Sequence, residues 1–218
     1  MKNRLFAIGD IHGCFYQFKT LIEDKICLKK EDQLILLGDY IDRGAQSKEV
    51  VDYIIELKNS GYDITALLGN HEAMLLDAYY NESKFSLWIM NGGMPTLYSF
   101  GIRDLKDLDV GYLDFFKSLT LVHPVDQYLF VHAGFNDEKP FVDQYSMLWR
   151  SKNSYKHPLL IDKRIVHGHS PVPLSTLEES VLANRQVLPI DTGCVFAGDR
   201  GLGKLTALKL YSGTIFSV

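Results

Sequence analysis

GDIHG (residues 9–13), GDYIDRG (residues 38–44) and GNHE (residues 69–72) are the segments of this 218-residue chain that decide its fold. Each follows a short apolar run typical of a buried strand, and each leads into a segment whose apolar residues have helical spacing. The apolar runs are Leu5–Ile8, Gln33–Leu37 and Ile64–Leu68. A strand, a loop and a helix repeated three times predict an α/β sheet with polar residues at the carboxyl ends of its strands.

The helices of these repeats are expected at Phe15–Lys25, after Ser47 as an N-cap, and from about His71 onward. From Asn81 to Leu119 the pattern is also helical, with Asp109 as an expected N-cap, so residues 81–119 are predicted to form a cap beside the site. Beyond it, short alternating segments predict strands at residues 121–125, 128–132, 164–167, 187–190 and 205–211. We expect these strands to form a second sheet packed on the first, giving a central β-sandwich of two mixed sheets flanked by helices.

Composition indicates an ordinary intracellular enzyme. With 46% hydrophobic residues and no linker or low-complexity tail, residues 1–218 are expected to form a single domain. The net charge of −4 argues against broad binding to nucleic acid or an anionic membrane. Three cysteines without CxxC spacing favour a reducing compartment, and the N-terminus reaches charged residues too early for a signal peptide. No apolar run approaches the roughly 18 residues of a membrane span. The expected compartment is therefore the cytoplasm.

Six polar residues are candidate ligands of two divalent cations: Asp10, His12, Asp39, Asn70, His132 and His169. Asp10 and His12 are one residue apart in a glycine-flanked loop, so both side chains can face one cation. Asp39 offers a carboxylate able to bridge two cations. Nitrogen and oxygen ligands without thiolate suit Mn best, with Fe or Zn as alternatives. Each residue taken alone also fits an ordinary turn or strand-end role, and the prediction depends on their occurring together.

The order of these segments resembles the phosphoprotein phosphatase family of calcineurin-like metallophosphoesterases, in its short bacterial branch of Ser/Thr protein phosphatases and diadenosine tetraphosphatases. The resemblance runs from Gly9 to about Leu210, and it includes HAG (132–134), MLWR (147–150), HGHSP (167–171) and IDTGC (190–194). It implies one metal on Asp10, His12 and Asp39, and another on Asp39, Asn70, His132 and His169. Pro171 stands where nuclease relatives have a second histidine, which favours the phosphatase branch, while His167 is either a neighbour of the ligands or a strand residue.

Four further residues are expected to act on the substrate. His71 is the expected acid for the leaving group, and Asp42 would orient it and raise its pKa. Arg43 and Arg150 present guanidinium groups suited to phosphoryl oxygens, and the resemblance places phosphate-binding arginines at both positions. Asn70 is expected to contact substrate as well as metal. The alternatives are a turn role for Asp42, a surface ion pair for Arg43 and a structural role for Arg150. The expected mechanism is in-line attack of a bridging hydroxide on phosphorus.

Three functions remain open from sequence. The favoured one is hydrolysis of phosphoserine and phosphothreonine in proteins, because the chain is short and lacks an obvious nucleotide-binding insertion. The alternative is a bis(5'-nucleosyl)-tetraphosphatase acting on diadenosine tetraphosphate. A non-catalytic metal-binding scaffold is less favoured. Trp88 and Trp149 are expected to be packing residues. Residues 197–204 form an extension of unassigned role. Its sequence nearly matches a phosphate-binding loop, but such a loop needs a Ser or Thr where this chain has Leu205. The oligomeric state is open.

Overall fold

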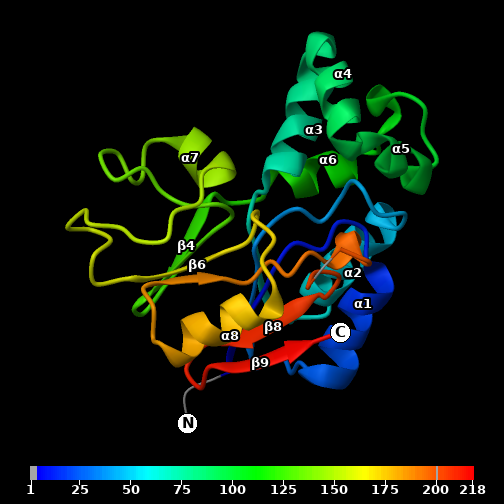
Figure 1. Cartoon of the computed structure of the whole chain (residues 1–218). Coiled ribbons are helices and arrows are strands. Elements are labelled where there is room, and N and C mark those ends of the chain that lie inside the picture. Colours follow the sequence, from blue (N-terminus) through cyan, green and yellow to red (C-terminus); the bar gives the residue numbers. More distant parts are fainter. Residues whose placement is uncertain (1–3, 200) are drawn as a thin grey trace.

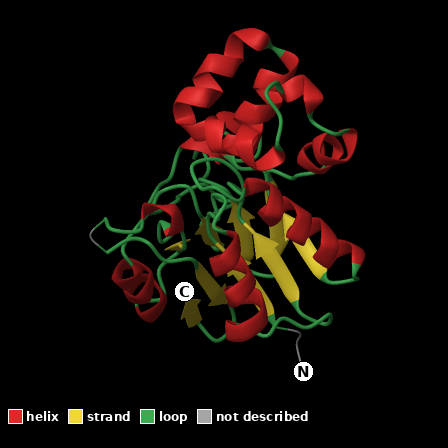
Figure 2. Cartoon of the chain, turned by 90° about the vertical axis from the view of Figure 1, so that its right-hand side faces the viewer, coloured by secondary structure: helices red, strands yellow, loops and turns green. Residues whose placement is uncertain are grey.

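The computed structural model describes residues 4–199 and 201–218, and it contains two stacked β-sheets with helices around them (Figure 1). The strand order is β3-β2-β1-β8-β9 in the first sheet and β4-β5-β6-β7 in the second. Figure 2 shows the strands as a central layer, with a group of helices standing above their ends. No helix in the described ranges is long and apolar enough to cross a lipid bilayer.

Three parallel strands open the chain, as the repeats predict. They are β1 (Leu5–Ile8), β2 (Gln33–Leu36) and β3 (Asp63–Ala66). Each strand is followed by a helix: α1 (Phe15–Thr20, continued by a wider turn over Leu21–Lys25), α2 (Ser47–Asn59) and α3 (Asn70–Tyr80). The N-cap of α2 is Gln46, so the prediction that Ser47 caps this helix is wrong. The Ser47 hydroxyl instead accepts a hydrogen bond from the backbone N–H of Asp42, 3.1 Å away.

The last two strands, β8 (Thr206–Lys209) and β9 (Thr214–Ser217), complete the first sheet. β8 pairs antiparallel with β1, and β9 pairs antiparallel with β8. The expectation that residues 205–211 join the second sheet is therefore wrong. An alternating pattern predicts that a segment is a strand, but it does not specify which strand lies beside it.

The second sheet begins with an antiparallel hairpin and continues in parallel. Its strands are β4 (Val122–Val125), β5 (Tyr128–Val131), β6 (Arg164–His167) and β7 (Val187–Pro189). The two residues between β4 and β5, Asp126 and Gln127, form the turn expected there. Two helices that the sequence did not predict lie in the long connections of this sheet: α7 (Gln144–Trp149) and α8 (Leu174–Leu182).

Alternate residues of each strand face different layers. Leu5 and Ala7 of β1 pack with Phe130 and Val166 of the second sheet, in a buried cluster between the sheets. Phe6 and Ile8, the other two residues of β1, belong instead to the core under the helices. This period of two is what strands buried on both faces require. The predicted fold class, a sandwich of two mixed sheets flanked by helices, is confirmed.

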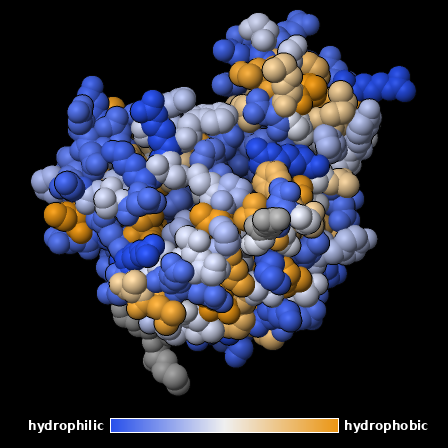
Figure 3. Space-filling model, in the orientation of Figure 1, coloured by the Kyte–Doolittle hydropathy of each residue, from blue (hydrophilic) through white to orange (hydrophobic). Residues whose placement is uncertain are grey.

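Residues 82–117 form a group of short helices that we call the cap. Its segments are Glu82–Lys84, α4 (Phe85–Trp88), the turn Ile89–Gly93, α5 (Met94–Phe100), Leu105–Asp107 and α6 (Val110–Lys117). Asp109 caps α6, as predicted, by accepting a 2.8 Å hydrogen bond from the Gly111 N–H. Figure 1 shows the cap beyond the strand ends, next to α3. In Figure 3, apolar residues gather on the visible face of the cap below its hydrophilic tip, whereas the surface between the cap and the sheets is mostly hydrophilic.

Leu208→Ala tests the placement of β8. Leu208 is 1% exposed and belongs to the cluster between the sheets, so its truncation should lower the free energy of unfolding by about 2–5 kcal/mol. The matched control is Leu182→Ala, because Leu182 is 86% exposed and its truncation should change stability by less than about 0.5 kcal/mol. Urea unfolding monitored by circular dichroism measures both variants. Similar stabilities would contradict the packing described.

Candidate metal centre

The loops at the carboxyl ends of strands from both sheets bring the six predicted ligands together. Asp10 and His12 follow β1, and Asp39 follows β2. The others come after β3, β5 and β6, at Asn70, His132 and His169. In open α/β sheets this edge is where ligand sites form. The structure thus places residues up to 159 positions apart in hydrogen-bonding contact, since the His169 N–H donates to both carboxylate oxygens of Asp10 at 3.0 Å.

Asp39 is the centre of the arrangement. Its Oδ2 lies 3.5 Å from Nε2 of His12 and 3.6 Å from Nε2 of His132, while its Oδ1 accepts the N–H of His71 at the start of α3. Potential ligand atoms gather in two groups that share this residue: His12, Asp39 and His71, and Asp39, His132 and His169. A carboxylate common to both groups is what a bridging ligand between two cations requires.

His12 and His132 are neutral, and each keeps one ring nitrogen with a free lone pair that can bind a metal. Nδ1 of His12 donates to the carbonyl of Ile41 at 2.8 Å, and Nδ1 of His132 donates to the carbonyl of Leu37 at 2.8 Å. Because a carbonyl only accepts, each Nδ1 carries the proton and Nε2 keeps its lone pair toward Asp39. Burial lowers the pKa of His12 to about 3 and also lowers the pKa of His132. Both rings are therefore uncharged at neutral pH.

The second group contains more acceptor atoms than protons. Nε2 of His132 lies 2.8 Å from Oδ1 of Asn70 and 3.2 Å from Nδ1 of His169, and the latter nitrogen is 2.9 Å from the same Oδ1. Burial lowers the pKa of His169 to about 4, so this ring is neutral as well. A cation among these three atoms would bind all their lone pairs at once.

Buried carboxylates also fit a cationic group. Asp10, Asp39 and Asp191 are each at most 3% exposed. Burial, followed by the charges of Asp191 and Asp39, raises the pKa of Asp10 well above its ordinary value, and burial raises the pKa of Asp191 to about 7. Neighbouring carboxylates that are buried away from water are costly to ionise together. Two divalent cations would offset their charge. The sequence did not single out Asp191 as part of the site.

His71 and Asp42 form the pair that the sequence predicts. Nδ1 of His71 donates to Oδ2 of Asp42 at 2.7 Å, and both side chains are at most 1% exposed. Burial lowers the pKa of His71, but the charge of Asp39 and the hydrogen bond to Asp42 outweigh it, so this pKa is raised. Nε2 of His71 is buried, has no hydrogen-bond partner among the described residues, and lies 4.0 Å from Oδ2 of Asp39. It can hold a proton that faces the centre.

The two predicted arginines lie in different surroundings. Arg43 places Nη1 2.5 Å from Nε2 of His12, and its guanidinium lies over the ring of Phe196 at 5.5 Å. A cation on His12 would use that nitrogen, so its binding must displace this contact. Arg150 is exposed, and its guanidinium lies 5.4 Å from the ring centre of Tyr145. No hydrogen bond within the described residues joins the Arg150 side chain to the candidate ligands.

Glu72 holds the two central loops together, a role that the sequence motifs did not predict. Its Oε2 accepts the N–H groups of Asp39 (2.9 Å) and Gly69 (3.1 Å), and its Oε1 accepts those of Tyr40 (2.7 Å) and Ile41 (3.3 Å). Gly69 permits this approach because a Cβ there would lie 2.2 Å from Oδ1 of Asp39. Glu72 stands three residues after the N-cap of α3, which is the capping-box spacing that could have revealed it.

The backbone is strained where the site residues emerge. Of the eight described non-glycine residues with φ between 45° and 70°, five lie at the site: His12, Asp39, Asp42, Arg43 and His169. Each such conformation costs energy for a residue with a Cβ and persists only where surrounding contacts fix it. Strain of this kind concentrates at functional sites, which agrees with the other features of this one.

Other residues considered from the sequence lie around the centre. His167 is buried at the end of β6, its Nδ1 donates to the carbonyl of Gly168 at 2.9 Å, and burial lowers its pKa to about 4. Trp149 sets its ring edge-on to His169, with 6.0 Å between ring centres. Within the extension 197–204, Arg200 lies outside the described residues.

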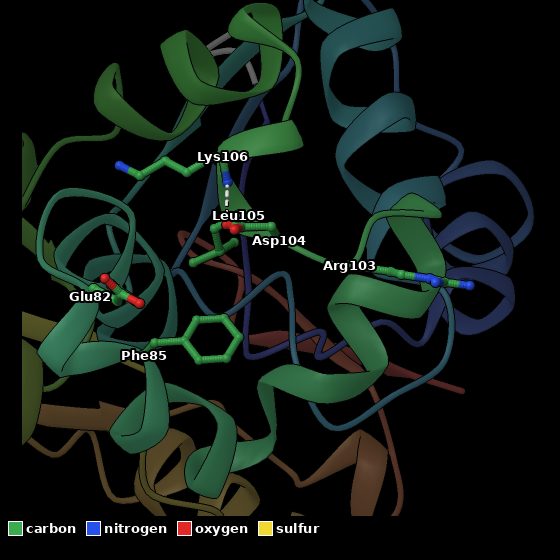
Figure 4. Close-up of a pocket in the computed structure, with 7 residues that line it drawn as sticks. Glu82, Phe85, Arg103, Asp104, Leu105 and Lys106 are labelled. Atoms are coloured by element: carbon green, nitrogen blue, oxygen red, sulfur yellow. Dashed lines mark hydrogen bonds between the residues drawn. The ribbon is translucent and has the colours of Figure 1, made fainter.

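A separate cavity of about 290 Å³ lies in the cap (Figure 4). Its lining residues are Ala78, Glu82, Phe85, Arg103, Asp104, Leu105 and Lys106. In Figure 4, the Arg103 side chain points away from the other side chains, and Asp104 accepts the backbone N–H of Lys106 at 2.9 Å. Ala78 is eight positions after Asn70 on α3, about 12 Å along the helix axis, so this cavity is distinct from the metal centre.

The fold and the centre together define a candidate site for divalent cations of the kind that metal-dependent hydrolases use. The family model described as calcineurin-like phosphoesterase matches residues 4–199. The chain is 30% identical to serine/threonine-protein phosphatase 2 of Salmonella typhimurium, over 94% of each protein. It therefore belongs to the calcineurin-like phosphoesterase family, which confirms the resemblance found in its motifs.

Other relatives are similar over less of their length. The chain is 33% identical to the symmetrical bis(5'-nucleosyl)-tetraphosphatase of Ectopseudomonas mendocina, over 60% of this chain and 44% of that protein. For another relative, the match covers only 28% of that protein's length. A crystal structure described as a putative diadenosine tetraphosphatase superposes with a TM-score of 0.71 at 20% identity, covering 100% of this chain and 94% of the other. That likeness supports the fold.

Glu72→Gln should loosen the centre. An amide offers one acceptor oxygen and turns an NH₂ group toward backbone donors, so buried N–H groups lose their partner, at a cost of about 1–3 kcal/mol in unfolding free energy. Asp77→Asn is the matched control on the same helix, because Asp77 is exposed, and it should change stability by less than about 0.5 kcal/mol. Chemical denaturation measures both. Equal stabilities would mean that Glu72 does not fasten the loops.

His132→Ala should remove one of two metal sites. After reconstitution with Mn, elemental analysis should find about two ions per wild-type chain and about one in the variant. His123→Ala is the control, because His123 is a half-buried residue of β4 in neither ligand group, and its metal content should stay that of the wild type. Unchanged metal content in His132→Ala would exclude this histidine as a ligand.

Proposed function

We propose that the chain is a dinuclear metal-dependent phosphatase that hydrolyses phosphoserine and phosphothreonine in proteins. The observation that carries the proposal is the shared Asp39 carboxylate, with two groups of ligand atoms around it and Nε2 of His71 facing it at 4.0 Å. Its relative over 94% of the chain bears the name of a protein phosphatase. The sparse cysteines and the net charge of −4 support a cytoplasmic protein without nucleic-acid or membrane partners.

The proposed division of the ligands is the one that the family resemblance implies. Asp10, His12 and Asp39 would hold one divalent cation, and Asp39 with Asn70, His132 and His169 would hold the other. The mixed nitrogen and oxygen donors suit Mn best, with Fe and Zn as alternatives. When bound, two such cations activate water as the nucleophile and neutralise charge on the phosphoryl oxygens.

The protein's own groups complete the reaction. His71 holds a proton at Nε2, and Asp42 fixes the ring through Nδ1, so the proton can pass to the departing alkoxide oxygen. Arg43, released from His12, would bind phosphoryl oxygens, and Arg150 would bind them as well. Asn70 would contact the phosphate as well as the metal. His71 can act as an acid only while its proton is retained, which its raised pKa favours.

A second candidate is hydrolysis of diadenosine tetraphosphate. One structural observation favours it: Tyr145 is 58% exposed and stacks with Trp149, with 6.4 Å between ring centres, and Trp149 contacts the ring of His169. Aromatic surfaces with a nearby cation, here Arg150, suit a nucleobase. A metal-binding scaffold without catalysis is less favoured, because it would not need the Asp42–His71 pair.

The deciding experiment measures phosphate release by metal-stripped protein reconstituted with Mn. Phosphoserine and phosphothreonine peptides are compared with diadenosine tetraphosphate at equal concentrations. We expect kcat/KM to favour the peptides by at least about tenfold, which corresponds to about 1.4 kcal/mol. A preference for the dinucleotide would favour the second candidate over the protein phosphatase. If neither substrate is hydrolysed, the non-catalytic metal-binding scaffold would remain as the explanation.

His71→Asn separates the role of acid from that of ligand. Removing the acid should lower kcat for a phosphoserine peptide by about 100-fold. Metal content, measured by elemental analysis, should remain at the wild-type value. Since Nε2 of His71 also belongs to one ligand group, loss of a metal ion from the variant would show that His71 binds metal instead.

A further inference from the structure

Two side chains from the cap bind the carboxylate of Asp42. The indole N–H of Trp88 donates to Oδ2 at 2.9 Å, and the hydroxyl of Thr96 donates to Oδ1 at 2.6 Å. Asp42, Trp88 and Thr96 are all at most 2% exposed. Together with Nδ1 of His71, the carboxylate has three hydrogen-bond donors, and two of them come from 46 and 54 positions further along the chain.

The same threonine also fixes the backbone of Asp42. Its Oγ1 accepts the Asp42 N–H at 2.9 Å, and Oγ of Ser47, 3.1 Å from Oγ1 of Thr96, accepts the same N–H at 3.1 Å. Asp42 has φ 70°, a left-handed conformation that costs energy unless its surroundings hold it. Thr96 therefore fixes both the main chain and the side chain of this residue.

The cap segment is shaped for this contact. Gly93 packs against the Trp88 indole so closely that a Cβ there would lie 2.5 Å from the ring, so only glycine leaves the ring in place. The preceding residue, Gly92, accepts the N–H of Arg43 through its carbonyl at 3.0 Å. Two consecutive residues of the GDYIDRG loop, Asp42 and Arg43, are thus fastened to one segment of the cap.

We propose that Trp88 and Thr96 are positioning residues for protonation of the leaving group. They hold the Asp42 carboxylate in one orientation, and the carboxylate in turn holds the His71 ring with Nε2 toward the centre. Without them, Oδ1 would lose its donor, Oδ2 would keep only His71, and the carboxylate could rotate. The inference rests on the proposed function, since it assigns these residues to the same reaction.

The effect depends on the leaving group. The leaving group of a phosphoserine peptide is a basic serine alkoxide that needs a proton. The leaving group of 4-nitrophenyl phosphate is a stable phenolate that needs little assistance. A change in the positioning of His71 should therefore lower kcat for the first substrate far more than for the second. A merely structural defect would lower both together.

The test compares Thr96→Val, Thr96→Ser and Trp88→Phe in the Mn-reconstituted protein. Thr96→Val keeps the side-chain shape and removes the hydroxyl, and we expect kcat for the phosphoserine peptide to fall by about tenfold or more while kcat for 4-nitrophenyl phosphate changes by less than about threefold. Thr96→Ser restores the hydroxyl and should return the wild-type ratio of the two rates. Trp88→Phe removes the N–H and should shift the ratio in the same direction as Thr96→Val. Thr214→Val, at the exposed first residue of β9, is the matched control and should leave the ratio unchanged.

Equal losses on both substrates, or an unchanged ratio in Thr96→Val and Trp88→Phe, would overturn the positioning role. Those results would leave the phosphatase intact, because the wild type would still turn over the peptide. If the wild type hydrolyses neither substrate with Mn bound, the proposed function fails, and the inference fails with it. Metal content of each variant, measured in parallel, should equal that of the wild type.

Discussion

The site depends on one buried carboxylate, Glu72, whose hydrogen-bond partners within the described residues are all backbone N–H groups. Glu72 accepts N–H groups from Gly69 at the start of α3 and from Asp39 to Ile41 in the loop after β2. Those two loops carry Asp39, Asn70 and the Asp42–His71 pair, so their separation sets the distances among these residues. Asp39 adds a second link, since its Oδ1 accepts the N–H of His71. A ligand set this dispersed in sequence stays together because its loops are bonded directly to one another.

Burial and charge are opposed at the centre. Burial keeps His12, His132 and His169 neutral, which leaves their lone pairs available. Burial also makes the carboxyl groups of Asp10 and Asp191 costly to ionise, because it raises their pKa values. His71 differs, because the negative charges beside it outweigh its burial. Divalent cations would bind the lone pairs and offset the carboxylates together. The same environment therefore gives some histidines the properties of ligands and one the properties of an acid.

The parts of the fold have different tasks. The two sheets place the metal ligands at adjoining strand ends, and this framework is common to the relatives that the chain resembles. The cap contacts the centre through Asp42 and Arg43, so it can influence the proposed acid and the proposed phosphate-binding residue. The segment with Tyr145, Trp149 and Arg150 borders the centre from the second sheet. Differences in substrate among members of such a family can arise in these outer parts while the ligand set stays the same.

The sequence by itself determined the strands of the first three repeats, the sandwich and the residues that gather at its edge, because burial periodicity and residue type are local properties. It also indicated the Asp42–His71 pair, because a carboxylate beside an imidazole can orient the ring and raise its pKa. Only the tertiary structure decided that β8 lies beside β1, that Ser47 faces Asp42 rather than capping α2, and that Glu72, Asp191, Trp88 and Thr96 belong to the site. The reason is physical: the hydrogen-bond partners of a side chain, and the neighbours of a strand, are set by packing between segments far apart in the chain, and a local pattern carries no record of them.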